Sequence, residues 1–472
     1  MSDHVTRTSN TSDSSSDSKP SLAALWQYLE QQQDSHLQRL LSYLRMPSIS
    51  AHGLGMDEVA AYLLDLLQTM GFAAQTLSTD GWPMVYAERI EDPDALTVLL
   101  YGHYDVQPPE PLEAWHSPPF EPTIREGRIY ARGAGDNKGQ HFAQLMALEA
   151  LLQQQGRLPC NVKVLLEGEE EIGSPNLAAC AQNHRQRLAA DVVITADGPV
   201  HESGRPTLHY GVRGILSFEL RAQEAVRDLH SGNWGGVVAN PLWTLVHLLS
   251  SMKDPNGQVL VDGFYDQVLP ATALEQQALQ ELPLDLARIQ RELAIDRLDA
   301  PAERGFYERL SLWPTLTING IHGGYGGAGS KTVLPCYAVA KCDVRLVEAQ
   351  TVDDIFSKLE AHVKKHAPQV EFVRQGAMEP SKTALEHPFS QPLMAAIHEA
   401  QGETPLRVPA MGGSLPDYVF TKILGMPAFG VPYANADEAN HAPNENLEVS
   451  RFFKGIRSGA AMLHYLAATR SA

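Results

Sequence analysis

The sequence predicts an α/β protein with a mostly parallel central sheet flanked by helices, and with an α+β domain inserted into the first domain. Up to about residue 209, apolar runs typical of buried strands alternate with amphipathic helical segments. From about residue 210 the pattern changes to strands of alternating polarity. From about residue 387 helix and strand return. This return indicates that both ends of the chain contribute to one sheet.

The chain length of 472 residues is too great for one ordinary core and indicates two or three domains. Residues 1–20 are rich in Ser, Asp and Thr and lack the apolar core of a signal peptide, so we expect a disordered tail. We assign residues 21–209 and 388–472 to the first domain. Residues 210–387 form the predicted inserted domain.

The first domain is predicted to begin with helices and strands in alternation. Apolar residues recur at helical spacing from Leu22 to Leu44, and Pro47 closes this segment. A second amphipathic helix is predicted at 57–70. Strands are predicted at 84–89 and 96–101, and the second is continuously apolar, as expected for a strand buried on both faces.

Further elements continue this alternation. They are helices at 140–154 and 176–188, strands at 161–166 and 191–195, and a long terminal helix at 447–468. Each buried strand is followed by a His or an acidic residue. Because open α/β sheets place their chemistry at the carboxyl ends of their strands, these side chains mark the expected site.

The inserted domain is predicted to contain strands at 211–221 and 333–346. An apolar helix is predicted at 240–252, with a proline at its first turn. Residues 253–313 are polar and show no clear periodicity. After the insertion, a helix is predicted at 415–424, directly after a Gly-Gly-Ser turn.

Charge and cysteine content narrow the classes of function. The chain has 37 basic and 56 acidic residues, a net charge of −19, which argues against nucleic acid and anionic membrane as partners. No apolar run is long enough to span a bilayer. The four cysteines form no C-x-x-C pair, so we expect reduced packing residues and a cytoplasmic protein.

Five potential metal ligands follow strand ends or lie in loops, although they are far apart in the sequence. They are His103, Asp136, Glu171, Asp197 and His441. Imidazole and carboxylate groups suit zinc, and also manganese or cobalt. Five ligands are too many for one open catalytic zinc, but they suit two ions about 3.5–4 Å apart that share one carboxylate. Asp136, the middle ligand, would bridge the two ions.

Other acidic residues near these ligands suggest supporting roles. Asp105 lies two residues after His103, so on an extended segment it shares a face with that imidazole and could accept its second N–H. A pair of ions at this spacing can stabilise the transition state of a hydrolysis. Hydrolysis by a metal-bound water also needs a general base that is not itself a metal ligand. Among Glu169, Glu170 and Glu171, spacing alone does not decide which residue binds metal and which accepts the proton.

Several motifs resemble those of the co-catalytic zinc exopeptidases, in particular the carnosine and cytosolic non-specific dipeptidase branch. They are Gly102–Pro108, Gly133–Gly139, Glu167–Ser174, Asp228–Gly232, Gly329–Pro335, Val344–Val347, Gly412–Pro416 and the segment around His441. The resemblance covers about residues 22–470, in the same order. It implies a zinc-exopeptidase-like catalytic domain and an inserted lid and dimerisation domain.

The resemblance also implies a role for each ligand. His103 and Asp197 would hold one zinc ion, and Glu171 and His441 the other, with Asp136 bridging. It further implies a cis peptide bond after the bridging aspartate.

By the same resemblance Glu170 would be the base, and Asp105 would orient His103. His230 would reach the active site of a partner subunit and steady the oxyanion, so a homodimer is implied. Thr332, Arg345 and Ser414 would bind the substrate, with Arg345 facing its carboxylate.

The sequence therefore predicts a cytoplasmic, metal-dependent dipeptidase that acts on short peptides with a free C-terminal carboxylate. The nearest alternative is an N-acyl-amino-acid deacylase or a carboxypeptidase with the same site. A non-catalytic binding module is a third possibility, but such a protein would be expected to lack a ligand or the base, and here all are present.

Overall fold

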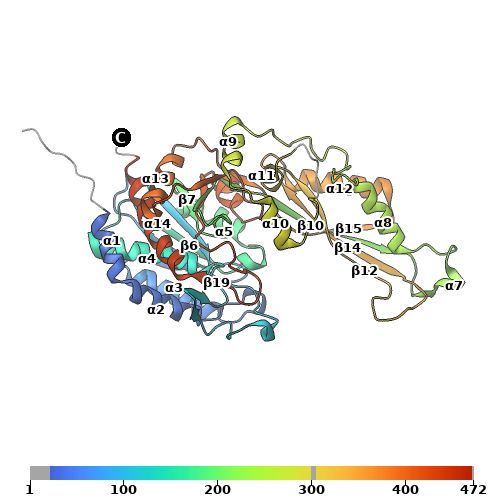
Figure 1. Ribbon diagram of the computed structural model, residues 1–472, viewed down its shortest axis with the longest axis horizontal. Helices are drawn as coiled ribbons and strands as arrows, with labels where there is room; N and C mark the ends of the chain where they lie inside the picture. Colours follow the sequence, from blue (N-terminus) through green and yellow to red (C-terminus); the bar gives the residue numbers. More distant parts are fainter. Residues whose placement is uncertain (1–21, 299–303, 470–472) are drawn as a thin grey trace, which may run out of the picture.

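The computed structural model describes residues 22–298 and 304–469, and its main feature is an eight-stranded mixed sheet (Figure 1). The strands are, in spatial order, β1 (Ala73–Leu77), β2 (Met84–Arg89), β6 (Asn161–Glu167), β3 (Thr97–His103), β7 (Val192–Thr195), β18 (Ala428–Gly430), β8 (Thr207–His209) and β17 (Leu406–Val408). The central strands β6, β3, β7 and β18 run parallel, and β17 is parallel to β8. This confirms the predicted mostly parallel sheet, which uses strands from both ends of the chain.

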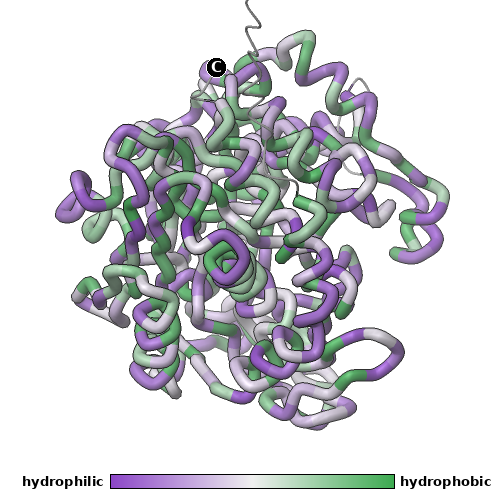
Figure 2. Tube along the Cα trace, turned by 90° about the vertical axis from the view of Figure 1, so that its left-hand side faces the viewer, coloured by the Kyte–Doolittle hydropathy of each residue, from purple (hydrophilic) through white to green (hydrophobic). Residues whose placement is uncertain are grey.

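Helices cover both faces of this sheet. One face packs against the long helices α4 (Lys138–Gln155) and α14 (Val449–Ala467), together with α1 (Ala23–Gln31), α2 (Gln33–Leu44), α3 (Met56–Thr69) and α13 (Ser390–Gln401). The other face packs against α5 (Leu177–Asn183), α6 (Arg185–Leu188) and a π-helical turn at Val419–Leu424. Hydrophilic and hydrophobic residues alternate along the peripheral helices, as amphipathic packing requires (Figure 2).

Strand β3 covers most of the continuously apolar run at 96–101, from which a strand buried on both faces was predicted. Val98 and Leu100 point into the core on one face of the sheet, whereas Leu99 and Tyr101 point into the core on the other. A strand with both faces covered buries successive side chains, so no polar position interrupts its sequence. The strand ends at His103, which lies at the carboxyl edge of the sheet.

A second, four-stranded antiparallel sheet is built from the middle of the chain. Its order is β12 (Thr315–Gly323), β14 (Tyr337–Leu346), β10 (Gly214–Gln223) and β15 (Glu371–Met378). Buried and partly exposed residues alternate along β10, because only one face is covered, by α8 (Pro241–Met252) and α12 (Val352–His366). We call the body around this sheet the small-sheet body and the body around the first sheet the large-sheet body. Figure 1 shows them side by side along the long axis of the molecule.

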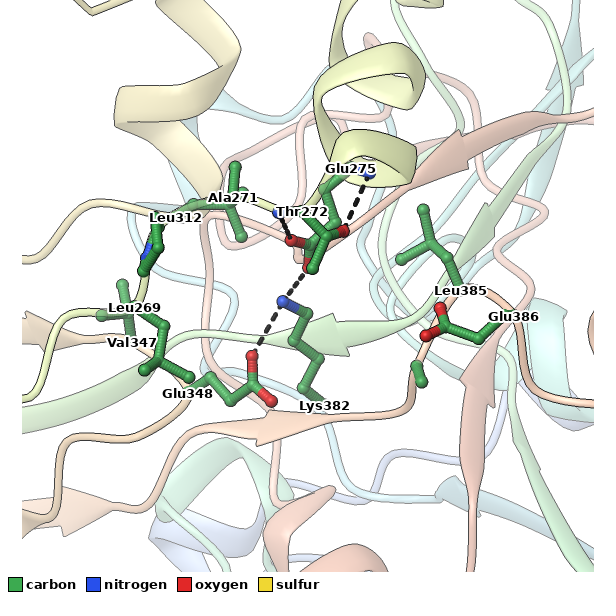
Figure 3. A pocket seen from close by; sticks show the side chains of 12 residues that line it. Leu269, Ala271, Thr272, Glu275, Leu312, Val347, Glu348, Lys382, Leu385 and Glu386 are labelled. Atoms are coloured by element: carbon green, nitrogen blue, oxygen red, sulfur yellow. Dashed lines mark hydrogen bonds and ion pairs between the residues drawn. The ribbon is translucent and has the colours of Figure 1, made fainter.

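The chain passes between the two bodies through a pair of hydrogen-bonded strands. Strand β9 (Gly211–Val212) leads into the small-sheet body, β16 (Ser381–Lys382) leads out of it, and the two pair antiparallel. Next to this crossing, the Lys382 ammonium lies between the carboxylates of Glu275 and Glu348 in a pocket of about 240 Å³ (Figure 3).

Some predicted elements differ from the structure. The segment Leu22–Leu44 is two helices that meet at Gln32, and the predicted helix at 176–188 is likewise two helices that meet at His184. The helix predicted at 415–424 is only the short π-helical turn Val419–Leu424. Residues 253–313, which showed no clear pattern, contain α9 (Ala273–Glu281), α10 (Leu286–Leu293) and α11 (Phe306–Ser311). The predicted tail at 1–20 lies outside the described residues. Among the described helices, none has the length and apolar character needed to cross a membrane.

Candidate metal centre

The five predicted ligands converge at the carboxyl edge of the large sheet. His103 ends β3, Asp197 follows β7, Glu171 lies in a short 3-10 turn after β6, and Asp136 lies in the loop before α4. His441 comes from the loop between β18 and β19 (Asn446–Glu448). Parallel neighbouring strands end at the same edge, which is why residues so distant in sequence meet there.

The ligand atoms form two groups that share Asp136. In the first group, His103 Nε2 lies 3.2 Å from Asp136 Oδ1 and 3.3 Å from Asp197 Oδ2. In the second, His441 Nε2 lies 3.0 Å from Asp136 Oδ2 and 3.2 Å from Glu171 Oε2. Each group contains one imidazole and two carboxylates, close enough to surround one ion. The two oxygens of Asp136 face different groups, which is the geometry of a bridging carboxylate.

Burial and charge indicate that these groups fit divalent cations. His103 is fully buried, and its Nε2 has no well-formed hydrogen bond although two carboxylates face it. Burial lowers the pKa of His103, but the neighbouring carboxylates, led by Asp105, raise it well above its usual range. Hydrogen bonds with Asp136 and Glu171 raise the pKa of His441 to about 10. An imidazole must be unprotonated to bind a metal ion, so a cation bound at either group would compete with protons for His103 and His441.

The loop that presents Asp136 is held by its neighbours. The Asp136–Asn137 peptide bond is cis, as the resemblance implied. The Asn137 side chain donates to Ala196 O and its Oδ1 accepts from His103 N (3.4 Å), so it links the ends of β7 and β3. Helix α4 starts directly against this loop, because a Cβ at Gly139 would lie 2.1 Å from Ala134 O.

Asp105 connects the first group to the glutamate turn. His103 Nδ1 lies 3.3 Å from Asp105 Oδ1 and 3.1 Å from Asp105 O, so Nδ1 donates towards Asp105 and Nε2 faces the ligand group. The two carboxylate oxygens also accept from Glu170 N (3.2 Å) and Glu171 N (3.1 Å). One buried carboxylate therefore sets both the imidazole and the turn that follows β6.

The three adjacent glutamates, which spacing did not distinguish, have different environments. Glu171 belongs to the second ligand group. Glu169 Oε2 accepts from Asn176 Nδ2 at 2.7 Å, next to the start of α5. Glu170 belongs to neither group of potential ligands, although burial raises its pKa well above the usual range, as expected close to other carboxylates.

Of the four predicted substrate residues, two meet and two lie elsewhere. Arg345, on β14, donates from Nη1 to Ser414 Oγ of the large-sheet body at 2.7 Å. His230 and Thr332 are exposed, and they pair with each other at 3.4 Å between His230 Nε2 and Thr332 Oγ1. Figure 1 shows α7 (Ser231–Trp234), directly after His230, at the far end of the small-sheet body. A single chain therefore does not bring His230 and Thr332 to the metal groups.

Sequence reasoning did not identify the residues that shape the Asp136 loop from behind. The Glu445 carboxylate is fully buried and accepts hydrogen bonds from several backbone N–H groups of that loop, and Arg132 pairs with it. These contacts join segments more than three hundred residues apart, so no local pattern marks them. The position of Glu445 four residues after His441 is the one signal that the sequence offers.

Comparisons with known proteins agree with this geometry. Residues 99–465 match the family described as Peptidase family M20/M25/M40. The chain is 30% identical to a Cys-Gly metallodipeptidase, DUG1, of Candida albicans, over 94% of this chain and 97% of the relative. The structure resembles an M20 family metallo-carboxypeptidase, Sso-CP2, from Sulfolobus solfataricus, with a TM-score of 0.87 and 36% identity over 92% of this chain and 99% of that one. It also resembles human carnosine dipeptidase 1, with a TM-score of 0.82 and 27% identity over 96% and 100% of the two chains.

Proposed function

Because this chain belongs to peptidase family M20/M25/M40, we propose that it is a metallodipeptidase that hydrolyses dipeptides and short peptides with a free C-terminal carboxylate. The observation that carries this proposal is the pair of ligand groups sharing Asp136. The relatives named for Cys-Gly and β-Ala-His hydrolysis match over nearly the whole chain, which supports dipeptides as the substrate class.

In the proposed centre, His103 and Asp197 would hold one ion, Glu171 and His441 would hold the other, and Asp136 would be shared between them. Zinc fits this set of imidazole and carboxylate ligands, and manganese or cobalt are alternatives. When bound, the ions lower the pKa of water and polarise the scissile carbonyl. Asp105 keeps the His103 ring in the orientation that the ligand group requires.

The remaining steps fall to residues of the chain. Glu170 accepts a proton from the attacking water and passes it to the leaving amine. Arg345 and Ser414 hold the substrate carboxylate, for which a guanidinium fork is well suited, and their 2.7 Å contact supports a common binding position. Recognition of that carboxylate directs cleavage to the peptide bond before the last residue of the substrate.

His230 and Thr332 act in the site of a partner subunit within a homodimer. His230 Nδ1 accepts from Gly232 N at 3.0 Å, so in the neutral ring Nε2 carries the proton and can donate to an oxyanion. Large apolar side chains lie exposed on the small-sheet body, at Trp243 and Val246 of α8 and at Ile318 and Ile321 of the edge strand β12. An exposed apolar helix together with an unpaired strand edge supports pairing with a second copy.

We further propose that residues 21–209 and 388–472 form the catalytic domain and residues 210–387 the lid and dimerisation domain. The paired strands β9 and β16 lie within a few residues of both boundaries. A cytoplasmic location is supported by the four cysteines, all of which are free.

A substrate panel tests the proposed function. The purified protein is assayed with Cys-Gly, β-Ala-His and other dipeptides, with N-acetyl and N-succinyl amino acids, and with longer peptides, with and without chelator, and its metal content is measured. We expect two ions per chain and chelator-sensitive turnover of dipeptides.

A carboxypeptidase is the second candidate, favoured by the likeness to the Sulfolobus metallo-carboxypeptidase. Removal of the last residue from longer peptides at a higher kcat/KM than any dipeptide would support it. Turnover of acylated amino acids alone would instead indicate a deacylase.

A further inference from the structure

The loop that carries Asp136 is organised around one buried carboxylate from the other end of the chain. Glu445 Oε1 accepts from Gly135 N at 2.9 Å and from Asp136 N at 3.0 Å, and Oε2 accepts from Gly133 N at 3.0 Å. The Glu445 side chain has no exposed surface. Three backbone N–H groups of one loop therefore point at a single anion, an arrangement that fixes the course of that loop.

Arg132 completes the surroundings of this carboxylate. Its Nη1 lies 2.7 Å from Glu445 Oε2, and the guanidinium is almost fully buried. The same guanidinium donates to Ala442 O (3.4 Å) and to Pro108 O (3.2 Å). A buried carboxylate is tolerated only when its charge and lone pairs are matched, and here four donors match both oxygens.

The same residue also fixes the segment that carries His441. Glu445 O accepts from Ala131 N at 3.1 Å, directly before the Asp136 loop, and the next residue, Asn446, begins β19. Ala442, which the Arg132 guanidinium contacts, follows His441. Glu445 therefore joins the segment of the shared carboxylate to the segment of the most exposed ligand.

We propose that Glu445 is a positioning residue of the dinuclear centre. It holds Asp136 so that its two oxygens face the two ligand groups, and it keeps His441 Nε2 within 3.0 Å of Asp136 Oδ2. This inference rests on the proposed ligand set. It adds that the bridging geometry is built by a side chain that touches neither ion nor substrate.

Glu445→Gln tests the proposal with little change in volume. A glutamine has one acceptor oxygen, and its NH₂ group would face N–H donors of the loop or of Arg132, so the loop must shift. We expect the affinity of at least one ion to fall about 10–100-fold, as is typical when an outer partner of a ligand is lost. The measurements are competition titrations with a chromogenic chelator, using zinc and cobalt, and the visible spectrum of the cobalt protein.

Glu275→Gln is the matched control. Glu275 is also a buried carboxylate in an ion pair, with Lys382, and it accepts from Thr272 N at 2.6 Å, but it lies in the first turn of α9 (Figure 3). Its loss is expected to lower the melting temperature while leaving both metal affinities and the cobalt spectrum unchanged. A general loss of stability is in this way separated from a specific effect on the metal centre.

A folded Glu445→Gln protein with wild-type metal affinities and cobalt spectrum would overturn the proposal. If this variant does not fold, Glu445→Asp decides, because its shorter side chain keeps the charge but does not reach all three amides. We expect at least about fivefold weaker metal binding in that variant, and wild-type binding would overturn the inference. Failure of the proposed function is seen separately, as a wild-type protein that binds no pair of ions or leaves dipeptides intact.

Discussion

Glu170 lies at the start of the short turn after β6. Its neighbours are Glu169, which accepts a hydrogen bond from Asn176, and the predicted ligand Glu171. Burial raises the pKa of Glu170 well above the usual range, and of the neighbouring groups His103 lowers it while Asp197 and Glu171 raise it. A general base at neutral pH must be ionised, and bound divalent cations would provide positive charge that favours the ionised carboxylate. The proposed role of Glu170 as the base would therefore depend on metal binding.

Glu170→Gln is expected to lower kcat about 10²–10⁴-fold, because the amide does not accept the proton of the attacking water. Metal content, measured on the purified variant, is expected to stay at two ions per chain, since Glu170 belongs to neither ligand group. Glu169→Gln is the control: its oxygen can still accept from Asn176 and turnover is expected to persist. Near-normal kcat in Glu170→Gln would exclude it as the base.

At the scale of single elements, strand β14 places Arg345, the residue proposed to bind the substrate carboxylate, against the large-sheet body. Arg345 is the one residue of this strand that the structure shows bonded to Ser414. Its guanidinium can hold two oxygens of a carboxylate in a planar fork, whereas a lysine ammonium acts as a point charge.

Arg345→Lys is expected to raise KM for dipeptides about tenfold, with a smaller change in kcat, because binding of the substrate carboxylate is weakened in the ground state as well. Arg221→Lys, on the neighbouring strand β10, is the matched control, since Arg221 pairs with Glu219 on the sheet surface. Steady-state kinetics of both variants provide the comparison. Equal KM values for the two would show that Arg345 does not bind substrate.

Strand β8 carries a buried histidine that links folding to pH. Burial lowers the pKa of His209 to about 4. Between about pH 6.5 and pH 4 the unfolded chain binds a proton that the folded chain does not, so the free energy of unfolding falls as the pH is lowered through this range. The loss over the whole range is about 3 kcal/mol.

His209→Phe is expected to remove this part of the pH dependence. Urea unfolding of wild type and variant at several pH values between 4 and 7 measures the difference in slope. His116→Gln, at an exposed position, is expected to leave the wild-type slope unchanged. A parallel pH dependence in His209→Phe and wild type would show that the imidazole is not the group responsible.

At the scale of the whole molecule, the proposed active site needs two chains. Glu170 and the metal ligands belong to one chain, and His230 comes from the other, so two inactive variants can complement each other. In a mixed dimer of Glu170→Gln with His230→Ala, one site contains both defects and the other contains neither. With random exchange of subunits we expect about one quarter of wild-type activity in an equal mixture of the two variants.

The mixture is prepared by co-expression, and each variant alone is the baseline. Activity that only equals the sum of the two separate variants would contradict action in trans. Sedimentation of the wild-type protein measures its molecular mass in solution and so tests separately whether it forms a dimer.

Patterns within short windows were enough to predict much of the architecture. The strand at 84–89 matches β2, and the continuously apolar run matches β3, because burial on both faces leaves a local signature. The break at Gln32 was not predicted, since neither glycine nor proline marks it. Helix α9 was missed although Thr272 and Glu275 form a capping box, a signal that was present in the sequence.

The metal centre, too, could be predicted only in part, because some of its contacts leave no local pattern in the sequence. The five predicted ligands follow strand ends or lie in loops and could be assembled from the sequence, and the structure brings them into two groups. The division of roles among Glu169, Glu170 and Glu171 depends on which way each side chain turns, and that direction is set by partners such as Asp105 and Asn176. Glu445 could not be predicted, because its partners are backbone N–H groups of a distant loop, and these carry no sequence signature.

The strands β9 and β16 mark the two ends of the insertion, and the proposed site residues are divided between the insertion and the rest of the chain. All five ligands lie outside the segment between these strands, whereas Arg345, Thr332 and His230 lie inside it. In the proposed reaction, the metal ligands, the base and Ser414 are therefore encoded outside the insertion, whereas Arg345, Thr332 and the oxyanion donor His230 are encoded within it. Substitutions around Arg345 can then alter which peptides are accepted while the metal ligands stay unchanged, whereas loss of His230 would also impair the proposed catalysis.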